Sequence, residues 1–337
     1  MVRIQSLRAF LSIPILVLLS SNALANDGNG TKNQAFSYFG LGVMASYYKE
    51  TSTGNSLLNV QSSSIPSSFV QYSGSYTPID ESYGFYITTM SPLFTISSTE
   101  IWNNTKSWNN VDYGTLQTNQ TELGLSHINI TGGKLLSPGH QLLAGIRYSQ
   151  HNFTRYNFHA GSGSSSLNTD LVDFYNSLTP EEQAIYAAFG DGIAFEIPGC
   201  TNQITPPSEG MECLSVAILE QVSSFSFTLG YRYDSFFIDG FDGNRFIFQS
   251  SIATPLVYII NNTFHPGNTL IGAFGGFDIT INTATSIFHR RDMQLMLGLE
   301  TSYIHRSQVR QAGNPLTYPY SDTIALSLYM NFSWAFD

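Results

Sequence analysis

The stretch IALSLYMNFSWAF, residues 324–336, decides the fold class. Every second residue from Ile324 onward is large and apolar, and the residues between them are mostly small or polar. Because side chains of a β-strand alternate between two faces, the stretch predicts a strand with one wholly apolar face of seven residues. A strand that faces lipid needs such a surface, with aromatic residues where it reaches the interface. We therefore expect a bilayer-crossing strand with Trp334 and Phe336 in its interfacial girdle.

The same period of two recurs upstream, most clearly over residues 39–48, 142–149, 225–234 and 293–303. A membrane helix needs about 20 consecutive apolar residues, and no such run follows residue 25. Charged residues make up only 11% of the chain, against roughly 25% in soluble domains, yet the mean hydropathy is only −0.04. A β-barrel combines these properties, because lipid-facing and lumen-facing residues alternate. The predicted fold class is an all-β, antiparallel transmembrane β-barrel.

In these features the chain resembles Gram-negative outer-membrane β-barrel proteins, whose last strand ends in an aromatic residue that the barrel-insertion machinery reads. Trp334 and Phe336 match that pattern, and Asp337 after the aromatic residue departs from it. The resemblance covers the leader and the strand pattern, and it indicates no particular family. It implies a location in the cell outer membrane, contact with outer-membrane lipid, and the insertion machinery as a partner.

The N-terminal residues have the organisation of a secretory signal peptide. Arg3 and Arg8 precede or flank an apolar run over residues 9–19, and Ala23-Leu24-Ala25 provides small residues for cleavage. We expect residues 1–25 to be removed, residues 26–35 to form a short disordered periplasmic lead-in, and residues 36–337 to form a single barrel.

Turn lengths predict the strand count. Short turns at residues 137–139, 239–244 and 289–292 indicate the periplasmic end, because such barrels keep long loops outside. The simplest count is ten strands, near residues 36–48, 67–77, 82–96, 117–135, 140–156, 221–235, 244–259, 269–287, 293–307 and 321–336. Pro92, Trp102 and Trp108 interrupt the pattern, so an additional hairpin within residues 82–135 would give twelve.

Residues 157–219 form an extracellular loop far longer than usual, which indicates a function. Thr179, Pro180 and Glu182 have the spacing of a helix start with a capping box, and a second short helix is expected just before it. Residues 161–166 are predicted to be flexible, so the helices either fold over the barrel mouth or project outward. In an oxidising compartment, Cys200 and Cys213 are expected to form a disulfide.

The charged residues of the strands are the candidates for lumen chemistry. Their neighbours place five of them on the polar, inward face: Arg147, Arg232, Asp234, Glu122 and Glu300. Two interpretations stay open, because a salt-bridged plug and a conducting path use the same residue types.

His305 and Ser307 are the only pair that suggests an enzyme, since residues two apart on a strand share a face. They are similar to the His-x-Ser pair of outer-membrane phospholipases and lipid A deacylases, although Gln308 stands where those enzymes usually have asparagine. The alternative is a polar strand end at the headgroup level, where His305, Arg306 and Arg310 meet lipid phosphates. No metal site or cofactor is predicted, and the formal charge of −10 argues against nucleic acid as a partner.

Three functions are compatible with these features. The first is a non-enzymatic, porin-like channel for small solutes, with the disulfide-stapled loop near its mouth. The second is a surface adhesin or structural barrel with a closed lumen, whose loop meets an extracellular ligand. The third is an outer-membrane lipid hydrolase. The sequence favours the channel.

Overall fold

The computed structural model describes residues 34–51, 57–77, 83–106, 111–188, 195–197, 200–202, 212–239, 244–263, 267, 269–290, 293–310 and 317–336. The predicted signal peptide and nearly all of the lead-in lie outside the described residues. None of the helices in the described part of the chain is long and apolar enough to cross a membrane.

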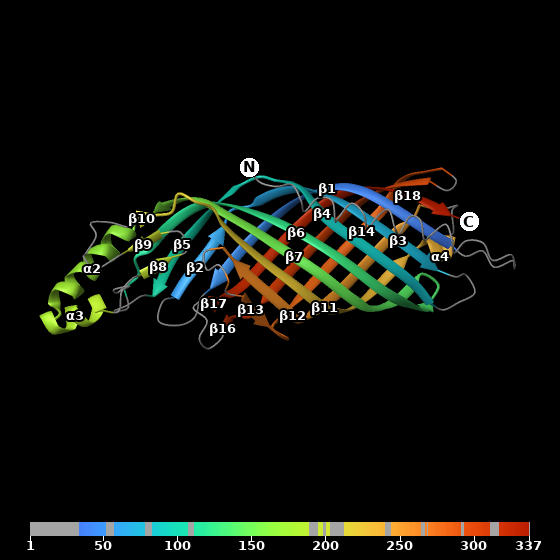
Figure 1. Cartoon of the computed structure of the whole chain (residues 1–337). Coiled ribbons are helices and arrows are strands. Elements are labelled where there is room, and N and C mark those ends of the chain that lie inside the picture. Colours follow the sequence, from blue (N-terminus) through green and yellow to red (C-terminus); the bar gives the residue numbers. More distant parts are fainter. Residues whose placement is uncertain are drawn as a thin grey trace.

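A closed antiparallel ring of ten strands forms the body of the molecule, as predicted (Figure 1). Its last strand pairs with its first from Ala35 opposite Phe336 to Thr51 opposite Tyr320, which closes the ring. The ring strands are β1 (Gln34–Thr51), β3 (Ile65–Thr77), β4 (Tyr83–Thr95), β6 (Gly114–Ser137), β7 (His140–Ala160), β11 (Ile218–Asp234), β12 (Phe246–Asn262), β14 (Gly276–Arg290), β15 (Met293–Arg306) and β18 (Tyr320–Phe336).

The interruption near Pro92 is a bend in two neighbouring strands and not an extra hairpin. The short strands β2 (Leu57–Ser62) and β5 (Ser98–Lys106) continue β3 and β4 beyond the bend. They keep the same neighbours, because β1 pairs with β2, β2 with β5, and β5 with β6. The register shifts where Phe69 faces Pro92, as expected for a residue without a backbone N–H. The count therefore stays at ten.

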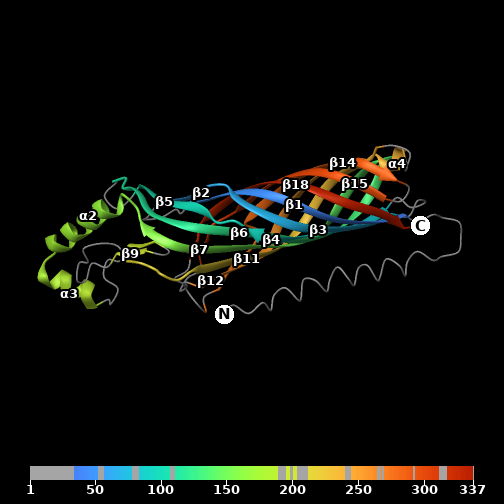
Figure 2. The same cartoon turned by 90° about the horizontal axis from the view of Figure 1, so that it is seen from above.

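The two ends of the barrel differ (Figures 1 and 2). The turn end carries the end of β18, the helical turn α4 (Phe236–Asp239) and the tight β6–β7 turn, where Gly139 has a φ of 79°. The loop end carries β13 (Thr269–Gly272), β16 (Val309–Arg310), β17 (Thr317–Tyr318) and a long projection.

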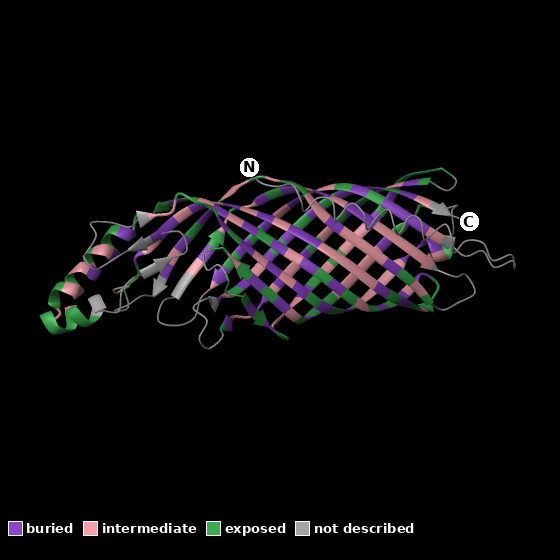
Figure 3. Cartoon of the chain, viewed as in Figure 1, coloured by how far each residue is buried: buried purple, intermediate pink, exposed green. Residues whose placement is uncertain are grey.

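The outer face of the ring is apolar over a limited height, here called the lipid band. Along β1, the outward residues Phe39, Leu41 and Val43 are 48–59% exposed, and the buried residues between them alternate with exposed ones along the strands (Figure 3). Toward the loop end the lipid band stops at a polar row, in which Asp322 of β18 lies between Lys49 and His305. The membrane-spanning segments therefore end at this row.

Above the lipid band the strands continue with their polarity inverted. The inward side chains Leu123 and Phe153 are at most 1% exposed, whereas Asn152 points outward and is exposed. This is the pattern of a β-structure in water, with an apolar interior. It corrects the prediction for Glu122, which lies on the outer face of β6 and accepts a hydrogen bond from Tyr156 at 3.1 Å. The prediction assumed that one polarity holds along the whole strand.

The projection extends beyond the strand ends, on β6 and β7 (Figures 1 and 2). It consists of α2 (Ser164–Ser177), α3 (Pro180–Ala188) and a small sheet of β8 (Phe195–Ile197), β9 (Cys200–Asn202) and β10 (Glu212–Cys213). The helices thus project outward instead of folding over the mouth. The predicted capping box is present, because Glu182 accepts a hydrogen bond from the backbone N–H of Thr179 at 2.8 Å.

The segment predicted to be flexible is instead attached to β6. The backbone N–H of Gly163 donates to the carbonyl of Thr115 at 2.7 Å, and α2 begins at the next residue. A Cβ atom on Gly163 would lie 1.7 Å from the carbonyl oxygen of Tyr113, so this close approach requires glycine. Leu167 and Leu171 of α2 are buried in a cluster with Val60, Trp102, Tyr113 and Leu116. This packing fixes the direction of α2.

Candidate functional site

The lumen contains successive layers of side chains, and the first one closes the turn end. Asp234, at the end of β11, forms ion pairs with two arginines. Its Oδ2 lies 2.6 Å from Nη2 of Arg245 and 2.9 Å from Nη2 of Arg232. The Arg245 guanidinium lies 4.3 Å from the ring centre of Phe36 and 5.2 Å from that of Phe236 in α4. Aromatic faces and a shared carboxylate thus hold two buried cations. We call this group the turn-end plug.

A polar cavity of about 90 Å³ lies above the turn-end plug. Its charged lining residues are Arg147, Arg232 and Glu300, and amides and hydroxyls from several strands line it together with apolar side chains such as Ile247 and Met296. Arg147 donates to Thr280 Oγ1 at 3.2 Å, while Glu300 accepts from Asn282 Nδ2 at 3.0 Å. The cavity thus combines charged and polar groups with apolar side chains in one wall.

The next layer toward the loop end combines an ion pair with apolar packing. Arg306 binds Asp278 through two nitrogens, one of them at 3.2 Å, and both side chains are 1% exposed. Met44, Tyr48, Phe69 and other buried apolar residues of the ring form one hydrophobic cluster in the interior. A buried ion pair and apolar side chains thus occupy this level of the lumen.

The uppermost layer is a single arginine held by three carboxylates, above the lipid band. Arg155 binds Glu100 (Nε–Oε2 2.9 Å), Glu50 (Nη2–Oε1 3.1 Å) and Glu220 (Nη1–Oε1 3.6 Å). All four side chains are at most 9% exposed. The guanidinium also lies 5.2–5.7 Å from the ring centres of three aromatic residues: Tyr48, Trp102 and Phe153. We call this group the Arg155 hub.

Burial shapes the protonation of the Arg155 hub. It raises the pKa of Glu50 to about 8, although Arg155 opposes this. It also raises the pKa of Glu220, again against Arg155. Burial acts to lower the pKa of Arg155, but the three carboxylates outweigh it and hold that pKa above its usual value. Three ionised acids around one base would give the Arg155 hub a net charge of −2, and protonation of Glu50 reduces this to −1.

The structure brings most of the sequence candidates for the lumen together. Arg147, Arg232 and Glu300 line the cavity, and Asp234 lies just below it in the turn-end plug. Glu122 is on the outer face, as described above. Seven further buried charged residues were not predicted for the lumen: Glu50, Glu100, Arg155, Glu220, Arg245, Asp278 and Arg306.

Arg306 had been assigned to the headgroup level together with His305, and this was wrong. The two residues are consecutive on β15, so their side chains point to opposite faces. His305 is half-buried on the outer face, whereas Arg306 is 1% exposed in the lumen. The alternation along β15 was sufficient to predict this.

The possible catalytic pair is not connected. His305 Nδ1 lies 2.8 Å from Asp322 Oδ1, and the Tyr303 hydroxyl donates to the same oxygen at 2.6 Å. Ser307 is held through its main chain, because its N–H donates to Gly275 and its carbonyl accepts from the Tyr258 hydroxyl at 2.9 Å. In the described part of the chain, no hydrogen bond joins His305 to Ser307.

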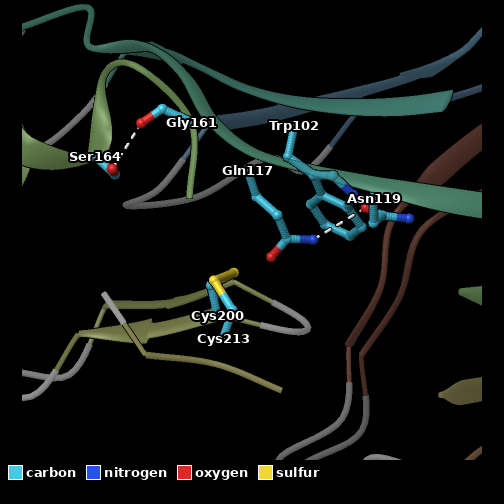
Figure 4. Close-up of a disulfide and its surroundings, with 7 residues drawn as sticks. All are labelled: Trp102, Gln117, Asn119, Gly161, Ser164, Cys200 and Cys213. Carbon is cyan, nitrogen blue, oxygen red and sulfur yellow. Dashed lines mark hydrogen bonds between the residues drawn. A yellow bond between two sulfur atoms is a disulfide. The ribbon is translucent and has the colours of Figure 1, made fainter. Parts of the chain in front are cut away.

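The disulfide between Cys200 and Cys213 is formed, as predicted (Figure 4). It joins β9 to β10, and Cys200 is fully buried in a cluster with Phe158 at the end of β7 and Ile218 at the start of β11. The disulfide thus staples the return of the long loop to the strands that carry it. Figure 4 also shows Ser164 of α2 donating to the carbonyl of Gly161.

The remaining sequence candidates are few. Trp334 lies on the outer face at the turn end, with its ring centre 5.8 Å from that of Phe332, and the side chain of Phe336 lies outside what the structure describes. Among the described residues, no group of three or more His, Cys, Asp or Glu side chains is placed to hold a metal ion.

Comparison with known proteins supports the fold. No family model matches the sequence, and no curated protein does either. The outer-membrane protease OmpT from Escherichia coli matches over 90% of this chain and 97% of its own, with a TM-score of 0.52 and 9% identity. This chain has the fold of outer-membrane β-barrels. At that identity the likeness shows the fold alone.

Two toluene transporters are more distant. TbuX from Ralstonia pickettii is 10% identical, with a TM-score of 0.34 over 89% of this chain and 90% of its own. TodX from P. putida is 9% identical, with a TM-score of 0.32 over 91% and 90%. Neither likeness is close enough to support an argument about function.

Proposed function

We propose that this chain is a non-enzymatic outer-membrane barrel with a closed lumen, which displays its projection outside the cell to bind a partner. The observation that carries the proposal is the set of buried ion pairs at three levels of the lumen. Every side chain in them is at most 11% exposed. A water-filled channel would instead expose its charged lining.

The energetics of these layers support a closed resting state. Breaking a buried ion pair by removing one partner costs about 3–5 kcal/mol, because the other charge stays buried and unpaired. A conducting path would have to disrupt the turn-end plug, the Arg306–Asp278 pair and the Arg155 hub, together with the apolar cluster between them. A small solute that diffuses through the lumen does not supply the free energy needed to break these ion pairs.

The projection provides the binding surface in this proposal. Its helix α2 is seated on the barrel by the buried Leu167 and Leu171, and its small sheet is stapled by the disulfide. Residues 157–219 contain eight of the 24 acidic residues of the chain and none of its 14 Lys and Arg residues. Asp173, Glu181 and Glu182 of this segment are exposed. A strongly acidic surface attracts a cationic partner, and such an interaction weakens as salt is added.

A porin-like channel is the second candidate. The polar cavity of about 90 Å³ favours it, since a purely structural barrel has no need of a chamber in its lumen. In this alternative the layers above and below the cavity rearrange to open a path for small solutes.

Single-channel conductance of the refolded protein in planar bilayers separates the two candidates. Full-length protein is compared with a variant that lacks residues 162–215, so the ring stays intact while the projection is lost. We expect no steady conductance from either protein, and salt-sensitive binding of a polylysine probe by full-length protein alone. Steady conductance from the full-length protein would refute the closed barrel. Conductance that appears only in the deletion variant would support a channel with a lid.

A further inference from the structure

Arg147 differs from the other arginines of the lumen, because it is buried without a carboxylate partner. It is 8% exposed and lines the cavity. Its Nη1 donates to a neutral hydroxyl, that of Thr280, and its Nε makes no hydrogen bond to a protein atom. Within the described part of the chain, no acidic side chain forms an ion pair with it. A buried guanidinium without a carboxylate partner is stabilised when an anion lies next to it.

The charge of the surrounding lumen does not supply one. From the turn-end plug up to the Arg306–Asp278 pair, the inward-facing residues include four arginines and three acids. Asp234 is shared by two arginines, and Asp278 is bound by Arg306. Glu300 also faces the cavity, but its hydrogen bond comes from Asn282. Even when Glu300 is counted, one positive charge remains in excess around the cavity, because the surplus acids of the lumen, Glu50, Glu100 and Glu220, are gathered around Arg155.

The charge and the N–H groups of Arg147 need a partner, and few kinds of group can provide one. An isolated buried charge costs several kcal/mol, and arginine does not lose its proton in proteins. Hydroxyl groups of the cavity wall add donors, because Ser251 of β12 and Thr280 of β14 line the same cavity as Arg147. The wall thus offers a cation and hydroxyl donors together.

We propose that the cavity binds a small monovalent inorganic anion, such as chloride, against the guanidinium of Arg147. The anion neutralises the excess positive charge around the cavity and accepts hydrogen bonds from hydroxyls of the cavity wall, those of Ser251 and Thr280. A volume of about 90 Å³ admits a halide with a few water molecules and excludes bulky organic anions. Glu300 lines the same cavity and opposes the anion, so this glutamate sets an upper limit on the affinity. The site is independent of the proposed surface function.

Thermal unfolding in potassium chloride and in potassium gluconate of equal ionic strength tests the proposal. Wild-type protein is expected to melt at a higher temperature in chloride, with a saturable dependence on its concentration, because an anion that binds only the folded state stabilises it. Arg147→Gln should lose this difference. Arg290→Gln is the matched control, since Arg290 is exposed at the turn end, and it should keep the difference. Equal melting temperatures of wild type in both salts would overturn the proposal.

Two further measurements do not depend on the folding of the Arg147 variant. Glu300→Gln removes the opposing charge, so the half-saturating chloride concentration should fall roughly tenfold. Crystals of wild-type protein grown in bromide should show an anomalous scattering peak within hydrogen-bond distance of the Arg147 guanidinium. A cavity without that peak would show that water alone fills the chamber. A Glu300 variant with unchanged chloride dependence would show that chloride acts outside this cavity, which would also overturn the proposal.

Discussion

Glu50 gives the barrel a stability that depends on pH in an unusual direction. In the Arg155 hub it lies 3.1 Å from the guanidinium, above the lipid band, and burial raises its pKa from 4.5 to about 8. In the unfolded chain this carboxyl ionises near its ordinary value. Between pH 4.5 and 8 the folded protein therefore holds a proton that the unfolded chain has released.

The sign and size of the effect follow from this difference. Because the folded state binds more protons in that window, the free energy of unfolding falls as the pH rises from 4.5 to 8. A pKa gap of about 3.5 at about 1.4 kcal/mol per unit gives about 5 kcal/mol as the upper limit. Burial also raises the pKa of Glu220, so the two glutamates titrate as a pair and share the effect.

The perturbation that tests this is Glu50→Gln, which keeps the shape and removes the titration. We expect the variant to lose most of the fall in stability between pH 4.5 and 8, and to exceed wild type in stability at pH 8. Denaturant unfolding followed by tryptophan fluorescence is the assay, since Trp102 donates to Glu100 at 3.2 Å and reports on the same layer. Glu122→Gln on the outer face of β6 is the control. A wild-type stability that is flat or rises over this window would refute the reasoning.

Three further predictions concern the stability of the barrel interior and of the projection. Asp278→Asn leaves Arg306 buried without its counter-charge and should lower the free energy of unfolding by about 3–5 kcal/mol, measured by denaturant titration in the same detergent. Cys213→Ser opens a loop of 13 residues' separation and should destabilise the projection by about 3 kcal/mol, seen as faster amide hydrogen exchange there and unchanged exchange in the ring. Gly163→Ala forces a Cβ atom against the carbonyl of Tyr113 and should detach α2, so that exchange in α2 rises while β6 stays protected; equal protection in α2 would contradict it.

The ring was predictable from sequence because the lipid band imposes one rule on every strand. Each outward residue between the interfaces must be apolar, so the period of two is visible at Ile324 and again at Phe39. The rule stops at the polar row beside Asp322, and beyond it water replaces lipid outside the strands. Glu122 was misplaced for this reason, since a single strand contains both patterns without any local signal of the change.

The layers of the lumen were harder to predict for a different reason. Which face a charge occupies follows from alternation, but which partner it meets depends on how ten strands are staggered around the ring. Arg155 binds Glu50 and Glu100, which lie 105 and 55 residues away in sequence. Contacts of this range are set by the closure of the ring, and no local pattern encodes them.

The composition of the projection has a consequence for how the cell surface is studied. Between Arg155 and Arg232 the sequence contains no Lys or Arg, and both of these arginines are buried inside the barrel with side chains 3% and 11% exposed. The most prominent part of the molecule therefore offers no cleavage site to trypsin. Shaving intact cells with trypsin would leave α2, α3 and the small sheet in place, whereas a protease that cuts after glutamate would find Glu181 and Glu182 exposed on α3.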